Sequence, residues 1–317
     1  MIFDRQQLEA FAAVVEKRHF GEAAAALNIT RGAISLRLKA LEEALGSPLV
    51  VRDEGNIPTP AGEVLLRHIR VLKVLEADTL QYIKPMGTER PRISIAVNAD
   101  SLATWFEDVA CEIAKSGVSL ELMVDDQDHT LPLLARGEAM GCVSTSSEPP
   151  RGFLAEPIGT MEYECVANVE FAQEYFPQGL GLHSVLAAPA VLYNQKDGLH
   201  TLFLERLLEP RVKNYATHFF PSPSALLSAI ERGVGYGLVP CIQAQPLIDT
   251  GQLVRLAPNH KIAVDLYWHH WETAPSNAQA ISDLVMRHAR RELIQPASRA
   301  ASELDECGPP SDSPDEL

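Results

Sequence analysis

The segment from Thr30 to Gly46 constrains the fold of this chain more than any other. Thr30 is suited to cap the start of a helix and Gly46 to end it. Between them, apolar residues recur at helical spacing and form a single stripe: Ile34, Leu38, Leu41 and Leu45. The pattern predicts an amphipathic helix over 31–45 that buries this stripe against the rest of its domain.

The residues before this segment predict two shorter helices. Leu8, Phe11 and Val15 have helical spacing, and residues 21–27 are rich in alanine, which permits close helix crossing. A short helix, a tight turn and an outward-projecting helix describe a helix-turn-helix. The face of the 31–45 helix opposite the stripe, together with its cap, then becomes the candidate nucleic-acid surface: Thr30, Arg31, Gly32, Ala33, Ser35, Leu36, Arg37 and Lys39.

These side chains suit the major groove of double-stranded DNA. Small residues allow close approach to the groove floor, and Arg31 and Arg37 are suited to guanine edges or phosphates. An outward Leu36 is explained by contact with thymine methyl groups. A three-helix protein-binding module is the alternative interpretation of the same pattern.

A β-hairpin and a long helix follow. Residues 48–52 and 57–59 are predicted as two strands joined by a turn over 53–56, which places Arg52 beside the phosphate backbone as part of a wing. Thr59 and Pro60 then begin a long helix whose apolar stripe is too broad for a simple linker. We expect it to pair with a second copy of the chain, because two wings then reach two half-sites.

Charge and composition exclude several classes of protein. The net charge is −15, yet residues 1–90 carry twelve basic and twelve acidic side chains, so the acidic excess lies entirely in the remainder. No apolar run spans a bilayer and the start is unlike a signal peptide, so we expect a cytoplasmic protein that does not enter membranes. Five scattered cysteines argue against a disulfide framework or a zinc site, and we expect no metal or cofactor.

The first 65 residues resemble the LysR-type transcriptional regulators. The residues that carry the resemblance are Phe20, Ala23, Ala24, Leu27, Ile29, Thr30, Ala33, Ile34, Ser35, Arg37, Leu38, Leu41, Glu42, Leu45, Gly46, Pro48, Leu49, Arg52 and the run Thr59-Pro60-Ala61-Gly62. Arg31 and Gly32 stand where a Gln-Ser pair is usual in that family. The resemblance implies a homodimer, commonly a tetramer, that binds promoter DNA.

The rest of the chain alternates strand-like and helix-like segments, which predicts parallel sheets covered by helices in two lobes. The expected architecture is therefore α/β: a winged helix-turn-helix, a long linker helix, and a two-lobed effector domain similar to periplasmic binding proteins. We predict these boundaries: the winged helix over 1–60, the linker helix and hinge over 61–90, the effector domain over 91–295 and a disordered acidic tail over 296–317. Within the effector domain, the first lobe is placed at about 91–167 and 266–295, and the second at about 168–265.

Polar residues follow the predicted strands of the effector domain. Ligands bind beyond the carboxyl ends of such strands, so the loops there should converge on one cleft. Ser101 opens a predicted helix over 102–115 and suits a carboxylate, whereas the aspartates suit an ammonium or guanidinium group. The candidate effector-binding residues are Asn98, Asp100, Ser101, Asp126, Ser144 and Asp197. The alternative, residue by residue, is that each aspartate only caps a helix or stays solvated.

The segments 93–105, 197–204 and 266–269 resemble the ArgP/LysG subgroup of the LysR-type regulators. That resemblance implies a sensor of lysine or arginine that controls genes such as an amino acid exporter. Three rivals remain: a regulator of this fold with a different small effector, an α/β enzyme with a fused DNA-binding head, and a solute-binding protein. The run Trp268-His269-His270-Trp271 is interpreted as packing, because adjacent histidines on a strand point to opposite faces.

Overall fold

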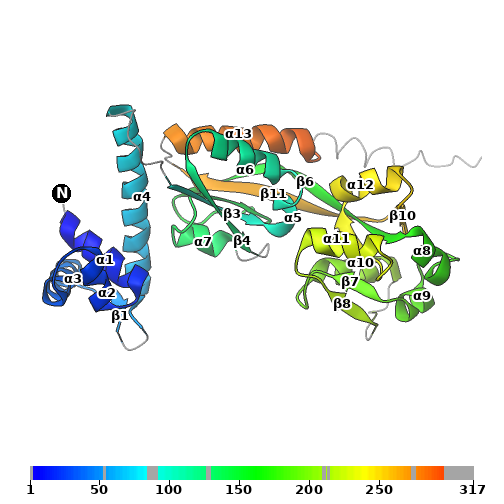
Figure 1. Ribbon diagram of the computed structural model, residues 1–317, viewed down its shortest axis with the longest axis horizontal. Helices are drawn as coiled ribbons and strands as arrows, with labels where there is room; N and C mark the ends of the chain where they lie inside the picture. The colour runs from blue at the N-terminus through cyan, green and yellow to red at the C-terminus, as the bar shows by residue number, and fades with distance from the viewer. Residues whose placement is uncertain are drawn as a thin grey trace, which may run out of the picture.

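The computed structural model describes residues 3–52, 55–83, 92–125, 130–208, 212, 215–272 and 276–295. The chain folds into a small N-terminal helical domain, one long helix and a larger α/β domain, arranged in that order along the molecule (Figure 1). In the described residues, no helix is both long and apolar enough to span a membrane. Three parts of the chain lie outside the described residues: 84–91, which include the end of the predicted linker and hinge region, the predicted tail over 296–317, and residues 53 and 54 of the wing turn.

The N-terminal domain contains the predicted helix-turn-helix and wing. Its helices are α1 (Arg5–Lys17), α2 (Phe20–Ala26) and α3 (Arg31–Leu45), and its hairpin pairs β1 (Val50–Val51) with β2 (Ile57–Pro58). The Thr30 hydroxyl accepts a hydrogen bond from the Ala33 amide at 3.2 Å, and Gly46 ends α3 in the left-handed conformation. The caps expected from the sequence are therefore confirmed.

The apolar stripe of α3 is buried over three of its four members. Ile34, Leu38 and Leu41 are at most 1% exposed, in one core cluster with α1, α2 and the start of α4. The prediction for Leu45 was wrong, since 38% of this residue is exposed. Leu45 closes the last turn of the helix, beyond the residues that α1 and α2 cover.

The long helix α4 (Pro60–Ile83) starts where the sequence predicted. The Thr59 hydroxyl accepts from the Gly62 amide at 3.1 Å and donates to the Pro48 carbonyl at 2.7 Å. A Cβ atom at Gly62 would collide with the Leu49 carbonyl oxygen, so glycine is required for this close approach of helix and hairpin. Leu65 of α4 is buried against the N-terminal domain, whereas several other apolar side chains of this helix are exposed: Val64, Leu75, Leu80 and Ile83.

The α/β domain is built on one seven-stranded mixed sheet with strand order β10-β6-β11-β5-β3-β4 and β9 paired to β6. Its strands are β3 (Arg92–Asn98), β4 (Ser119–Asp125), β5 (Gly141–Ser144), β6 (Phe153–Asn168), β9 (Gly237–Pro240), β10 (Leu253–Arg255) and β11 (Lys261–Trp271). A second, parallel pair joins β7 (Ala190–Leu192) to β8 (Thr217–Phe219). The prediction of parallel sheets holds for β3, β4 and β5, and for β7 with β8, but β6 is antiparallel to all of its neighbours.

Helices flank these strands. They are α5 (Ala99–Leu102), α6 (Phe106–Lys115), α7 (Thr130–Ala135), α8 (Val169–Tyr175), α9 (Leu182–Ala187), α10 (Gly198–Leu208), α11 (Pro223–Glu231), α12 (Cys241–Asp249) and α13 (Ser276–Glu292). The single helix predicted over 102–115 is thus two helices, with a break at residues 103–105. The helix α13 packs against α6 and β11 (Figure 1).

The paired strands β6 and β11 pass from the first lobe of the α/β domain to the second and connect the two lobes (Figure 1). The first lobe carries β3, β4 and β5, and the second carries β7, β8, β9 and β10. Trp268 and His269 of β11 are at most 1% exposed, and the Trp268 indole donates to the Ser282 hydroxyl at 2.9 Å. The interpretation of this aromatic and histidine run as packing is confirmed.

Candidate functional site

The predicted DNA-facing surface of α3 lies open to solvent. None of its eight candidates is buried, nor is Arg52 of the wing, and Leu36 is 71% exposed. The large exposed leucine follows from the geometry of the helix, because α3 turns its stripe toward α1 and leaves the opposite face uncovered. This face is available to a partner molecule.

Three basic residues of this surface have partners within the chain. The Arg37 guanidinium donates to the Gln6 side-chain oxygen of α1 at 2.7 Å, and Lys39 pairs with Glu43 at 3.6 Å. Arg52 lies 3.7 Å from the Glu42 carboxylate, and its guanidinium sits over the Phe20 ring. These contacts are at the surface, where ion pairs contribute little, so phosphates or bases can replace them at small cost.

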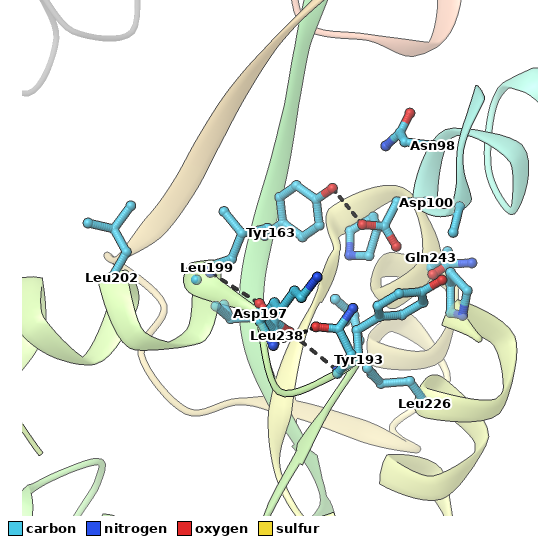
Figure 2. Close-up of a pocket in the computed structure, with 17 residues that line it drawn as sticks. Asn98, Asp100, Tyr163, Tyr193, Asp197, Leu199, Leu202, Leu226, Leu238 and Gln243 are labelled. Atoms are coloured by element: carbon cyan, nitrogen blue, oxygen red, sulfur yellow. Dashed lines mark hydrogen bonds between the residues drawn. The ribbon is translucent and has the colours of Figure 1, made fainter. Parts of the chain in front are cut away.

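A cavity of about 320 Å³ lies between the two lobes of the α/β domain. Its walls come from segments far apart in the sequence: the end of β3, β6, the loop after β7, and helices α10, α11 and α12 (Figure 2). The polar residues that line it are Asn98, Asp100, Tyr163, Tyr193, Asn194, Lys196, Asp197 and Gln243. The larger apolar residues are Leu199, Leu202, Leu226 and Leu238.

The cavity contains three of the six predicted effector-binding residues, Asn98, Asp100 and Asp197. Ser101 and Ser144 are buried, at 0% and 2% exposure, and neither lines the cavity. The Ser144 hydroxyl instead accepts from the Ser146 amide at 3.2 Å. Asp126 lies outside the described residues.

The two cavity aspartates are held differently. The Tyr163 hydroxyl donates to the Asp100 carboxylate at 2.8 Å, as the dashed line in Figure 2 marks. Asp197 accepts from two backbone amides, from Leu199 at 3.1 Å and from Tyr193 at 3.3 Å. Asp197 therefore caps the start of α10 and also lines the cavity, so the alternative interpretation as a helix cap is confirmed and its role in effector binding stays a prediction.

Several buried polar atoms at the cavity lack a hydrogen-bond partner among the described residues. They include both side-chain atoms of Asn98, which is 2% exposed, and the Oε1 atom of Gln243. An unpaired buried polar atom costs about 1–3 kcal/mol. Because these atoms belong to residues that line the cavity, a bound molecule with its own donors and acceptors would satisfy them.

The sequence did not indicate Tyr163 and Gln243. Tyr163 belongs to β6, and Pro157 and Gly159 in this strand are residues typical of turns. A register shift in the β6–β11 pairing at this point accommodates them. Gln243 follows a strand by three residues, which places it near a carboxyl end, but glutamine in the first turn of a helix carries no distinctive signal.

A buried histidine lies behind the cavity wall in the second lobe. His200 is 1% exposed, and its Nδ1 atom lies 3.0 Å from the Tyr215 hydroxyl. Burial lowers the pKa of His200 to about 4, so the ring is neutral at physiological pH. Burial, and then the nearby Asp197 carboxylate, raise the pKa of the Tyr215 phenol.

Two family matches divide the chain as the fold does. Residues 5–63 match the bacterial regulatory helix-turn-helix protein of the lysR family, and residues 88–290 match the LysR substrate binding domain. The chain belongs to the LysR family. LysR proteins are transcriptional regulators rather than enzymes, which removes the rival in which the cavity performs catalysis.

Individual relatives narrow the position within the LysR family. The HTH-type transcriptional regulator ArgP of Vibrio parahaemolyticus is 36% identical over 294 residues, which cover 92% of this chain and 99% of that protein. The crystal structure of ArgP from Mycobacterium tuberculosis is similar with a TM-score of 0.84, at 35% identity and coverage of 92% and 99%. Full-length LysG from Corynebacterium glutamicum with bound effector Arg is similar with a TM-score of 0.80, at 31% identity and coverage of 92% and 100%. ArgP and LysG are the proteins that define the subgroup that the sequence resembles.

Proposed function

We propose that this LysR regulator senses a basic amino acid, arginine or lysine, in the cavity between its lobes. The observation that carries the proposal is the charge of the cavity lining, which among the described residues contains two carboxylates, Asp100 and Asp197, and one cation, Lys196. A ligand with a net positive charge complements this lining. The arginine bound to the related LysG supports the same class of effector.

The shape and polarity of the cavity also suit an amino acid with a long side chain. A cavity of about 320 Å³ is at the lower end of the range for small-molecule sites. Leu199, Leu202 and Leu226 supply an apolar wall for the methylene groups of such a side chain. Polar residues from both lobes line the cavity, Asn98 and Asp100 in the first lobe and Asp197 and Gln243 in the second, which suits a ligand that is charged at both of its ends.

We propose that α3 enters the major groove of promoter DNA with the wing beside the phosphate backbone. The proposed contacts are Thr30, Arg31, Gly32, Ala33, Ser35, Leu36, Arg37, Lys39 and Arg52. Exposure of this face and the helix-turn-helix geometry support the assignment. Such a protein acts where the chromosome is, so we assign it to the cytoplasm.

We propose that the chain works as a homodimer joined through α4, and as a pair of such dimers. The exposed apolar side chains of α4, among them Leu80 and Ile83, support pairing with a second copy. Effector binding then favours one arrangement of the lobes, which changes how the dimers pair and how the DNA-binding domains are spaced. The regulated genes in this proposal are those of an amino acid exporter or of related metabolism.

Calorimetric titration of the full-length protein with each of the twenty amino acids tests the effector proposal. We expect heat of binding for arginine or lysine and a large loss of affinity in the Asp100→Ala variant. Absence of binding by every basic amino acid contradicts the proposal. Equal affinity in the wild type and in Asp100→Ala contradicts the placement of the effector.

A further inference from the structure

The side chain of Gln243 joins the two lobes across the cavity. It projects from the first turn of α12 in the second lobe, and its Nε2 atom donates to the Ala103 carbonyl oxygen of the first lobe at 3.1 Å. These two residues are 140 positions apart. A carbonyl oxygen only accepts hydrogen bonds, so the contact fixes which end of the Gln243 amide is nitrogen. The oxygen must then point the other way.

The Oε1 atom of Gln243 is unusual because it is buried but accepts no hydrogen bond from the described residues. The residue itself lines the cavity. The amide cannot rotate to improve this without breaking the bond to Ala103. Gln243 therefore presents a fixed acceptor to whatever occupies the cavity.

The neighbouring groups define what the acceptor meets. Asn98 offers a buried donor, Nδ2, which also lacks a partner among the residues that the structure describes. A carboxylate needs such a donor, whereas a guanidinium or ammonium side chain needs only acceptors. In an α-amino acid, the ammonium group shares a carbon with the carboxylate and so lies at the same end. Asp100, three residues before Ala103, adds a carboxylate to the part of the cavity lining that would meet the α-ammonium group.

We propose that Gln243 is a specificity-determining residue whose Oε1 atom accepts a hydrogen bond from the α-ammonium group of the effector, with the α-carboxylate at Asn98. The side-chain cation extends along Leu199 toward Asp197. This inference rests on the proposed amino acid effector and adds the orientation of that effector. Asn98 and Gln243 belong to different lobes. A ligand whose head group forms hydrogen bonds with both residues therefore favours the arrangement in which the two lobes lie close together around the cavity.

The test compares arginine with deaminoarginine, in which hydrogen replaces the α-ammonium group, by calorimetry on the full-length protein. In Gln243→Met, which keeps the length of the side chain, we expect arginine to bind about tenfold more weakly or worse, since hydrogen bonds to charged groups have this strength. The affinity for deaminoarginine should stay within about twofold of the wild type. Gln245→Met is the matched control, since Gln245 lies on the same helix but is exposed and outside the cavity.

A second variant and one wild-type measurement keep the inference testable if Gln243→Met folds poorly. Gln243→Glu retains an acceptor oxygen but loses the donor to the Ala103 carbonyl, so both ligands lose affinity while the preference for arginine over deaminoarginine should remain at least about tenfold. The wild type should bind deaminoarginine at least about tenfold more weakly than arginine.

Three results overturn the inference: unchanged arginine affinity in Gln243→Met, equal losses for arginine and deaminoarginine in that variant, or equal affinity of the wild type for both ligands. If the wild type binds no basic amino acid at all, the proposed function fails instead.

Discussion

Asp197 both caps helix α10 and contributes a carboxylate to the cavity. A substitution that separates these two roles is the most direct test of the effector assignment. The substitution Asp197→Asn removes the charge and keeps the oxygen that accepts from the Leu199 amide at 3.1 Å, but it loses the second oxygen, which accepts from the Tyr193 amide at 3.3 Å. Asparagine caps helices about as well as aspartate, but its amide nitrogen cannot accept from Tyr193, so the free energy of unfolding should fall by about 1–2 kcal/mol. In a domain of this size, that corresponds to a decrease in Tm of about 2–8 °C.

The effect on binding should be much larger. Asp197 is half-buried, and a pair of unit charges about 4 Å apart near a protein surface attract by about 4 kcal/mol before the cost of desolvation. The net contribution of a charged hydrogen bond is about 1.5–3 kcal/mol, so we expect arginine to bind Asp197→Asn about 10-fold to 150-fold more weakly. The cation of arginine, rather than its shape, should account for this loss.

Citrulline separates the two roles, because it has nearly the shape of arginine but a neutral side chain. Calorimetry of both ligands with both proteins forms a double-mutant cycle. The affinity for citrulline should be nearly the same in the wild type and in Asp197→Asn. If arginine and citrulline lose affinity by the same factor, Asp197 acts only as a cap, and the reasoning from cavity charge is refuted.

Three further predictions concern other parts of the molecule. Arg37→Ala should weaken promoter binding in a gel-shift assay by about 1–3 kcal/mol, as expected for a residue that contacts bases, and unchanged affinity would count against the placement of α3 in the groove. Leu38→Ala, at a fully buried position, should destabilise the protein by about 2–5 kcal/mol in urea unfolding, and Leu45→Ala by far less; equal losses would contradict the burial of the α3 stripe. Burial lowers the pKa of His200 from the model-compound value of 6.5 to about 4, so the unfolded chain binds more protons between these values and stability should fall as the pH decreases from about 6.5 to about 4. In His200→Gln this part of the pH dependence of Tm should disappear, and an identical profile in both proteins would show that another group is responsible.

Local patterns in the sequence were sufficient for the N-terminal domain and the linker helix. Three local signals define these helices: the period of the apolar residues, the caps at Thr30 and Thr59, and the stop at Gly46. Each acts within one or two helical turns, so it can be recognised in the sequence without knowledge of tertiary contacts. The same holds for the strands of the first lobe, whose carboxyl ends were expected to bring Asn98 and Asp100 to the cleft. Both residues do line the cavity.

Only the tertiary structure decided the rest of the cavity. Ser101 and Ser144 sit beside strand ends as expected, yet the packing of the lobes buries them away from the cavity. Tyr163 and Gln243 reach it because β6 crosses both lobes and because α12 faces α5, although Gln243 and its partner Ala103 are 140 residues apart. The physical reason is that helix periods and caps depend on neighbours in the chain, whereas a cavity depends on how separate elements fill the space between them.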